Sequence, residues 1–281
     1  MAASLLGAHM PTSGGLGAAI RNGKAIGCEA VQVFTSSPQQ WKSREVTDEM
    51  VDDFRRARHK TGINVVVSHD SYLVNLSSTD PELREKSFRG LAAEMERCSR
   101  YGIGWVVSHM GSGKGWGPGE AILGLIEATG RLLSETPPDV TLLMETTAGQ
   151  GAALNSRFEE IAQILDALGN PDRLAVYLDT CHIFAAGYDL RTKETYEATF
   201  SEFDRLVGIS KLKAIHCNDS QKALGSRVDR HAHIGEGEIG PEAFRLLVND
   251  SRFDGLPILL ETPEAPEGHE RNLKTLRSYR R

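Results

Sequence analysis

Short apolar runs alternate along the chain with longer amphipathic segments. Eight of these runs have the length of buried strands, and they are Ser4–Ala8, Ala30–Phe34, Ile63–Ser68, Trp105–Ser108, Thr141–Met144, Leu174–Leu178, Leu212–Ile215 and Pro257–Leu260. They recur at intervals of roughly 25 to 45 residues, which is typical of parallel strands joined by crossover helices. The pattern therefore predicts an α/β fold in which helices follow strands.

The segments between the runs have helical periodicity. In Asp80–Tyr101 the apolar side chains recur near the spacing of one helix face, and Asp80 followed by Pro81 is a typical helix start. Similar segments cover Asp48–Lys60, Gly119–Ser134, Asn155–Leu168, Glu194–Val207 and Pro241–Asn249. Eight strands with eight helices favour a (β/α)8 TIM barrel over a doubly wound sheet, in which the strand ends would be spread along an edge.

Six of the runs are followed directly by residues that we expect to bind metal ions, namely His69, His109, Glu145, Asp179, His216 and Glu261. In a TIM barrel these C-terminal strand ends converge on the active site. Three more ligand types lie close behind: His182 follows Asp179 by three residues, and Asp229 and His231 lie in the loop after the seventh run. Five imidazoles and four carboxylates suit Zn²⁺, with Mn²⁺ or Fe²⁺ as competitors.

A single His or Asp at a strand end more often caps a helix or accepts a hydrogen bond than binds a metal, so the prediction depends on the strand ends taken together. His9 also ends a run, and we expect it to support a ligand from behind or to contact a phosphate. The cysteines form no CxxC pair, and we expect reduced thiols outside the metal site at Cys28, Cys98, Cys181 and Cys217.

Composition sets limits on the class of protein. The 281 residues are 40% hydrophobic and 25% charged, without a linker or low-complexity segment, which favours a single globular domain over residues 1–281. The start of the chain lacks a signal-peptide pattern and no run approaches the roughly 20 apolar residues of a membrane span, so we expect a cytoplasmic protein without membrane contact. The net charge of −6 argues against a polyanionic partner, but three divalent cations would offset it.

Three longer segments carry a resemblance to a known family. Glu145–Gly151, Leu178–Asp189 and Gly225–Gly237 are similar to signatures of the endonuclease IV family of DNA-repair enzymes. Shorter matches extend the resemblance from Gly7–His9 to Glu261-Thr262. The resemblance implies a trinuclear zinc site on a (β/α)8 barrel. It also implies hydrolysis of the phosphodiester 5′ to abasic sites in double-stranded DNA, leaving a 3′-hydroxyl and a 5′-deoxyribose phosphate, with 3′-blocked ends as further substrates.

The same resemblance implies a role for each of the nine side chains. One zinc would be held by His69, His109 and Glu145, and Glu145 would bridge to a second zinc that is also bound by Asp179, His216 and Glu261. The third zinc would be held by His182, Asp229 and His231. Glu145 and Glu261 are the candidates for orienting or deprotonating the attacking water.

Several exposed loops are expected to contact DNA. Tyr72 and Leu73 follow the strand end at His69 and are placed to wedge into the duplex. Phosphate contacts are expected from Arg227 and Arg230, together with Lys42, Arg44, Arg191, Lys193 and Lys222. The loop Thr35–Trp41 has Ser37 and lacks the basic residue that relatives can carry there, which predicts a weaker or redistributed grip on the lesion. We expect a monomer, because DNA must reach an open barrel mouth.

The glycine-rich loop Gly111–Gly119 connects a strand to a helix but lacks the GxxxxGK[ST] arrangement of a phosphate-binding P-loop. We interpret it as a mobile connection that could act as a lid.

Two other functions stay open at this stage. A sugar isomerase or epimerase with the same barrel would use one or two metals, and it would leave His182, Asp229 and His231 without a role. A protein that binds the lesion without cutting would not need a full ligand set. The number of metals per chain tests the first alternative, and incision of abasic DNA tests the second.

Overall fold

The computed structural model describes residues 3–117 and 119–281. Met1 and Ala2, the first residues of the segment predicted to lack a signal peptide, and Pro118 of the glycine-rich loop lie outside the described residues.

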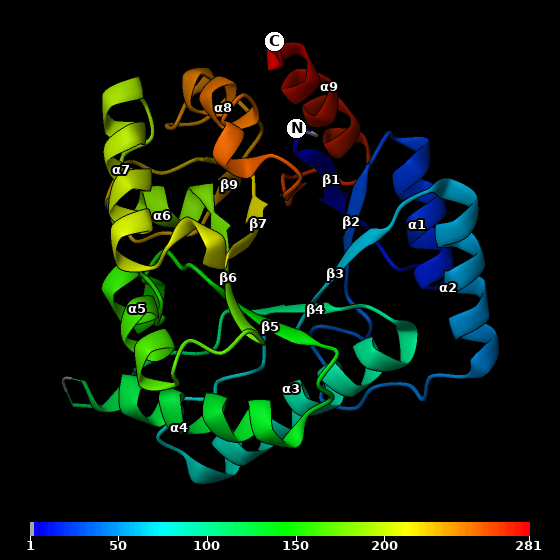
Figure 1. Ribbon diagram of the computed structural model, residues 1–281, viewed down its shortest axis with the longest axis vertical. Coiled ribbons are helices and arrows are strands. Elements are labelled where there is room, and N and C mark those ends of the chain that lie inside the picture. Colours follow the sequence, from blue (N-terminus) through cyan, green and yellow to red (C-terminus); the bar gives the residue numbers. More distant parts are fainter. Residues whose placement is uncertain (1–2, 118) are drawn as a thin grey trace.

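The centre of the molecule is a closed barrel of eight parallel strands, which confirms the predicted (β/α)8 fold (Figure 1). Each strand coincides with one of the apolar runs. In the order of hydrogen bonding around the barrel they are β1 (Leu5–His9), β10 (Pro257–Leu260), β7 (Leu212–His216), β6 (Leu174–Asp179), β5 (Thr141–Glu145), β4 (Trp105–Ser108), β3 (Val65–His69) and β2 (Ala30–Val33).

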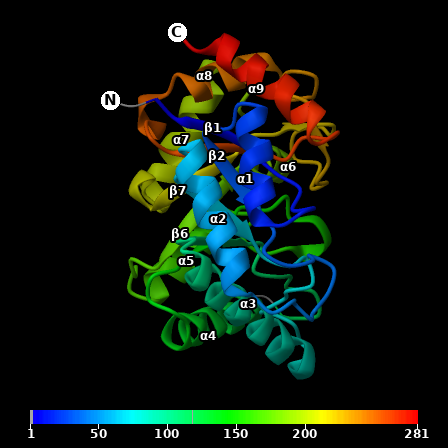
Figure 2. The same ribbon diagram turned by 90° about the vertical axis from the view of Figure 1, so that its right-hand side faces the viewer.

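Helices surround the barrel on its outer side (Figures 1 and 2). They are α1 (Leu16–Ala25), α2 (Asp48–Thr61), α3 (Pro81–Tyr101), α4 (Glu120–Glu135), α5 (Phe158–Ala167), α7 (Lys193–Leu206), α8 (Pro241–Val248) and α9 (Glu267–Tyr279). The six predicted helices are confirmed, with ends shifted by up to three residues. Helices α1 and α9 were not predicted from the sequence.

Small elements lie in the connections after β5, β6 and β7. Helix α6 (Thr180–Ala186) starts directly after β6, and β8 (Asp219–Ser220) pairs with β9 (His231–Ala232) as an antiparallel ribbon. Short 3₁₀ turns are η1 (Gln150–Ala152), η2 (Ile209–Lys211) and η3 (Ser251–Phe253). None of α6, β8 and β9 was predicted.

Local sequence signals explain where the best-defined helices begin and end. The side chain of Asp80 accepts hydrogen bonds from the backbone N–H groups of Glu82 and Leu83, and Pro81 occupies the first turn of α3. Gly102 ends α3 at φ 73°, a left-handed conformation that glycine adopts without strain. Thr47 caps α2 in the same way as Asp80, by accepting from the N–H of Met50.

The core has two layers. The barrel interior is filled by side chains from alternating strand positions, namely Ala30, Val67, Val107, Leu143, Ala175, Tyr177, Ala214 and Leu259. A larger layer lies between the strands and the helices. A Cβ at Gly7 would lie 1.9 Å from the carbonyl oxygen of Ala30, so glycine is required for β1 to lie this close to β2.

The register of the parallel strands brings the metal-binding residue types to one end of the barrel. Asp179 pairs with His216 across β6 and β7, and His69 pairs with Val107, two residues before His109.

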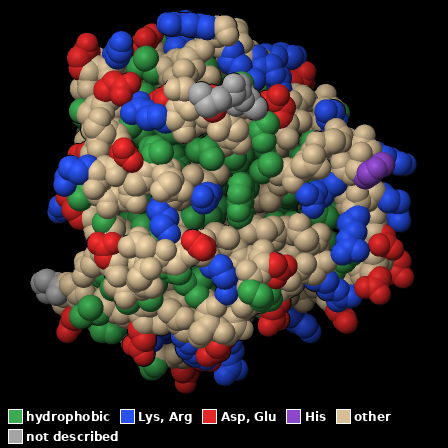
Figure 3. Space-filling view, viewed as in Figure 1, with side chains coloured by type: hydrophobic (Ala, Val, Ile, Leu, Met, Phe, Trp, Pro, Cys, Tyr) green, Lys and Arg blue, Asp and Glu red, His purple; other side chains and the backbone are tan. Residues whose placement is uncertain are grey.

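The face seen in Figure 3 carries side chains of both charges, with hydrophobic side chains gathered in a hollow at its middle. Within the described ranges, no helix is both long enough and apolar enough to cross a membrane.

Candidate metal centre

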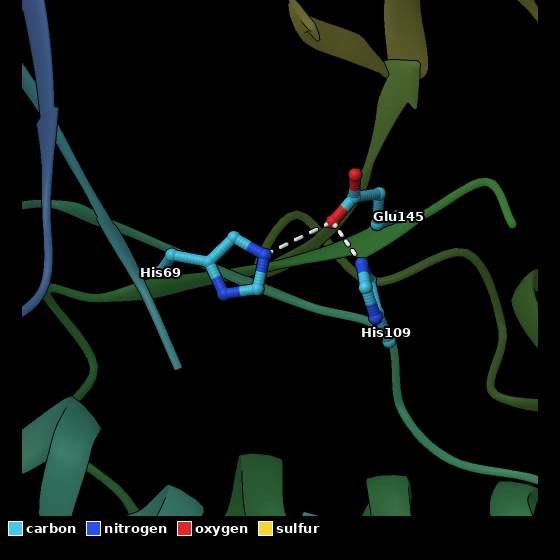
Figure 4. A group of neighbouring side chains, drawn as sticks. All are labelled: His69, His109 and Glu145. Atoms are coloured by element: carbon cyan, nitrogen blue, oxygen red, sulfur yellow. Dashed lines mark hydrogen bonds and ion pairs between the residues drawn. The ribbon is translucent and has the colours of Figure 1, made fainter. Parts of the chain in front are cut away.

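The first group of possible ligands consists of His69, His109 and Glu145, from three neighbouring strands. Oε2 of Glu145 lies 3.2 Å from Nε2 of His69 and 3.1 Å from Nε2 of His109. Figure 4 shows both rings turned toward this carboxylate. The three side chains thus present two nitrogens and one oxygen to a common point.

The central group shares Glu145 with the first group. The other carboxylate oxygen of Glu145, Oε1, lies 2.8 Å from Nδ1 of His216. The same nitrogen lies 3.6 Å from Oδ2 of Asp179 and 3.5 Å from Oε2 of Glu261. Glu145 therefore offers one oxygen to each group, as a bridging carboxylate does.

The outer group consists of His182, Asp229 and His231. The two oxygens of Asp229 lie 3.1 Å from Nε2 of His182 and 3.3 Å from Nε2 of His231. Oδ2 of Asp179 lies 3.6 Å from Nε2 of His231 and at the same distance from Nδ1 of His216. Asp179 therefore lies between the central and outer groups, a position that the sequence analysis did not give it.

The electrostatics of the centre favour positive charge. Burial opposes a charge on His69, but the hydrogen bond and the charge of Glu145 outweigh it and raise the pKa to about 10. At His231 burial is likewise outweighed by the nearby charges of Asp179 and Asp229, and the pKa rises to about 9. Burial acts to raise the pKa of Glu145, yet the charges of His109 and His216 hold it well below its usual range. The carboxylate of Glu145 therefore stays ionised and attracts cations.

Backbone carbonyls fix the orientation of three of the rings. Nδ1 of His69 donates to the carbonyl of Asp70 at 2.9 Å, and Nδ1 of His182 donates to that of Thr146 at 2.8 Å. Nδ1 of His231 donates to the carbonyl of Glu261 at 3.2 Å. Because a carbonyl can only accept, Nδ1 carries a proton in each ring, so Nε2 is the nitrogen that would bind a metal in exchange for the second proton.

The donor set fits divalent metal ions. Nε2 of His231 is buried, faces the carboxylates of Asp179 and Asp229, and has no hydrogen-bond partner among the described residues. A buried ring nitrogen without a hydrogen-bond partner destabilises the folded state, and a metal ion bound to it would remove that cost. Imidazole nitrogens and carboxylate oxygens in groups of three and four are the ligands expected for zinc or similar metals.

Several residues that hold the ligands were missed by the sequence analysis. Gln32 is fully buried; its Nε2 donates to Oε1 of Glu261 at 2.6 Å, and its Oε1 accepts from Nε2 of His216 at 2.7 Å. Asn218 donates to Oδ2 of Asp179 at 2.8 Å and accepts from the N–H of Glu261. A polar residue inside an otherwise apolar run was the available signal for Gln32.

The structure places His9 directly against a possible ligand. Its Nδ1 lies 2.9 Å from Oε1 of Glu261. Its pKa is lowered, chiefly by burial, although Glu261 acts to raise it. His9 is thus placed to support Glu261, one of the two roles expected for it.

One cysteine lies within reach of the centre. Cys181 forms a possible ligand group with Asp179 and His231. Its Sγ instead contacts the carbonyl of Arg230 at 3.6 Å, and burial raises the pKa of the thiol, which disfavours the thiolate that a metal would need. The four cysteines are free and buried.

The residues expected to wedge into DNA lie at the rim of the centre. Tyr72 is 58% exposed, and its ring lies 5.5 Å from that of Phe34 and 5.8 Å from that of His69. Leu73 beside it is half-buried.

The seven expected phosphate contacts are all exposed. Arg191 is held by an ion pair with Asp189 at 2.9 Å. In the described part of the chain, no ion pair is found for the other six, which are Lys42, Arg44, Lys193, Lys222, Arg227 and Arg230.

Comparison with known proteins agrees with this geometry. Residues 20–279 match the family described as "Xylose isomerase-like TIM barrel". A Chloroflexus aggregans protein named "Probable endonuclease 4" is 49% identical over 275 residues, covering 97% of this chain and 96% of that protein. The crystal structure of endonuclease IV from Thermus thermophilus superposes with a TM-score of 0.88 at 36% identity, covering 98% of each chain.

A more distant likeness shows the fold alone. A D-allulose 3-epimerase from Methylomonas sp. superposes with a TM-score of 0.68 at 16% identity, covering 98% of this chain and 91% of that one. The near-complete coverage at 49% identity, by contrast, confirms the family resemblance found in the sequence motifs. The chain belongs to the endonuclease IV family of xylose isomerase-like TIM barrels.

Proposed function

We propose that this protein is a DNA-repair endonuclease that hydrolyses the phosphodiester 5′ to abasic sites in duplex DNA. The observation that carries the proposal is the arrangement of nine possible ligands in three groups, joined by Glu145 and Asp179. It is supported by relatives named as endonucleases that match almost the whole chain. We further propose that residues 1–281 act as one domain and that 3′-blocked ends are also substrates.

The proposal includes three Zn²⁺ ions per chain, with Mn²⁺ or Fe²⁺ as alternatives at one site. The first group would hold one ion, the central group a second, and the outer group a third. Ions bound there would supply a nucleophilic water at neutral pH and would stabilise charge on the phosphate and on the leaving oxygen.

Of the two candidate catalytic glutamates, Glu261 is the better placed to accept a proton from the attacking water. Its side chain is 17% exposed, whereas that of Glu145 is fully buried between two ligand groups. A general base must reach the water that it deprotonates. His9 and Gln32 hold Oε1 of Glu261, which leaves Oε2, the oxygen that faces the central group, to orient the attacking water beside the ion.

Recognition of the lesion is assigned to the loops around the centre. An abasic nucleotide has no base to unstack, so turning it out of the duplex costs little. Tyr72 and Leu73 would fill the vacated space, and Arg227 and Arg230 would contact phosphates of the backbone. Ser37 cannot wedge into the duplex as a long basic side chain could, so Tyr72 would contribute more of the binding energy for the lesion.

The experiment that tests the proposal uses a duplex with a single abasic site and a 5′ label on the damaged strand. Cleavage 5′ to the lesion should leave a 3′-hydroxyl, stop after treatment with a chelator, and return when Zn²⁺ is added. Metal analysis should give about three ions per chain. One or two ions without incision would instead favour a sugar isomerase or epimerase, and binding without incision would favour a lesion-binding protein.

The proposed working form is a monomer in the cytoplasm. The cytoplasm keeps thiols reduced, which agrees with four free cysteines.

A further inference from the structure

One face of α3 packs against the loop 35–43. Gly90, Glu94 and Arg97 follow helical spacing and so share a face of the helix. The ring of Trp41 lies directly over Gly90, where an added Cβ would come within 3.3 Å of Cζ3. Nζ of Lys86 lies 4.7 Å from the centre of the same ring. Trp41 is therefore fitted closely to the helix.

A buried ion pair on this face binds the loop. Glu94 is 3% exposed and forms an ion pair with Arg97. Oε1 of Glu94 accepts a hydrogen bond from the hydroxyl of Thr35 at 2.6 Å. The guanidinium of Arg97 donates to the hydroxyls of Thr35, Ser36 and Ser43 at 3.1, 3.2 and 2.8 Å. These contacts replace the backbone ladder that the loop, which lacks regular structure, cannot provide.

The opposite side of the loop contacts the segment that carries Tyr72. The carbonyl of Pro38 accepts hydrogen bonds from the hydroxyl of Ser71 at 2.7 Å and from the N–H of Tyr72 at 3.2 Å. The loop therefore lies between α3 and Tyr72, and its position fixes the backbone from which the exposed Tyr72 ring projects.

We propose that Glu94 and Arg97 are positioning residues for DNA binding, acting through the loop 35–43 on Tyr72. The inference rests on the proposed function, because it assigns a purpose to contacts beside the DNA-facing rim. A cavity of about 240 Å³ lies beside the loop and is lined in part by Ser36, Trp41 and Arg97. It gives the loop room to shift if the contacts with Glu94 and Arg97 are lost. A loop that is already ordered avoids paying its ordering entropy when DNA binds.

The test compares Arg97→Ala with Arg100→Ala for incision of an abasic duplex. Arg100 lies on the same helix and also has one carboxylate partner, Asp48 at 3.0 Å, but it makes no described contact with the loop. We expect Arg97→Ala to raise KM about tenfold, with kcat and metal content unchanged, and Arg100→Ala to match the wild type. Arg97→Lys should recover part of the loss, since it keeps the ion pair with Glu94.

Removing Arg97 leaves the charge of Glu94 buried without a cationic partner, which can destabilise the fold, so two further variants are compared that keep this ion pair. Ser36→Ala with Ser43→Ala removes two contacts to Arg97 and leaves the ion pair intact. Gly90→Leu fills the space over Gly90 in which the ring of Trp41 packs. Leucine also has a higher helix propensity than glycine, so the substitution should not weaken α3 itself. Both should raise KM without lowering the melting temperature.

The outcomes separate this inference from the proposed function. If the wild-type protein does not incise abasic DNA, the proposed function fails. If the wild type incises but the variants of Arg97, Ser36 with Ser43, and Gly90 all keep its KM, the positioning role is wrong. A fall in kcat or in metal content at unchanged KM would also overturn it, because the effect would then pass through the metal centre.

Discussion

The side-chain oxygen of Gln32 accepts a hydrogen bond from Nε2 of His216 at 2.7 Å, across the interior of the barrel mouth. The side-chain nitrogen of Gln32 donates to Oε1 of Glu261 at 2.6 Å, and the hydroxyl of Tyr177 donates to Oε1 of Gln32 at 3.1 Å. One buried amide thus orients two of the four side chains of the central group. It also fixes which ring nitrogen of His216 faces Glu145.

We therefore expect Gln32→Ala to lower the affinity of the central group for Zn²⁺. Loss of a group that orients metal ligands typically costs about 10- to 100-fold in metal affinity. Competition with a chelator of known affinity measures the change. Gln163→Ala, an exposed glutamine on α5, should have no effect. Unchanged zinc affinity in Gln32→Ala would show that Asn218 and the strand ends alone hold these ligands.

Among the described residues, Asp229 is the carboxylate that the outer group does not share with another group, because Asp179 also faces the central group. Asp229→Asn removes the charge that faces His182 and His231 at 3.1 and 3.3 Å. The purified variant should contain about one metal ion less per chain and should incise abasic DNA at least about tenfold more slowly. Asp52→Asn on the exposed face of α2 is the control. Full metal content in Asp229→Asn would contradict an ion at the outer group.

Tyr72 is exposed at the rim while its edge packs near Phe34 and His69. Tyr72→Ala should raise the Kd for a duplex with an abasic analogue by about 5- to 150-fold, since an aromatic stacked on bases contributes roughly 1–3 kcal/mol. Metal content should stay at the wild-type value. Leu123→Ala removes a similarly exposed side chain, 62% exposed on α4, and should not change DNA binding. Equal Kd values for the two variants would exclude Tyr72 as a contact.

The strand ends could be predicted from the sequence because each follows a short, mainly apolar run. The ligand types at His69, Glu145 and Asp179 end buried strands, and the barrel brings such ends together. The sequence could not show that Asp179 lies between two groups. That position depends on the side-chain rotamer and on the register of β6 against β7, which includes an irregularity between Val176 and Tyr177.

The elements that were missed lack local signals. Helix α1 contains Gly17 and Gly23, which are unfavourable inside a helix, and α1 and α9 share with the predicted helices α4 and α8 the lack of a side-chain cap at the N-terminus. Helix α6 is seven residues long with six buried, so it shows no polar face from which periodicity could be read. Gln32 lies inside a buried strand, where only the closed barrel shows that it faces the ligands.

His269 on α9 makes the stability of the protein depend on pH. Burial lowers its pKa to about 4, while Nε2 donates to the carbonyl of Thr262 at 3.0 Å. The unfolded chain takes up a proton near pH 6.5 and the folded chain does not, so the free energy of unfolding falls as pH drops from 6.5 to 4, by up to about 3 kcal/mol from this residue. In His269→Gln the amide can keep the hydrogen bond but cannot titrate. The melting temperature of the metal-stripped variant should therefore fall less over this range than that of the wild type or of His59→Gln, an exposed control, and parallel curves would contradict the argument.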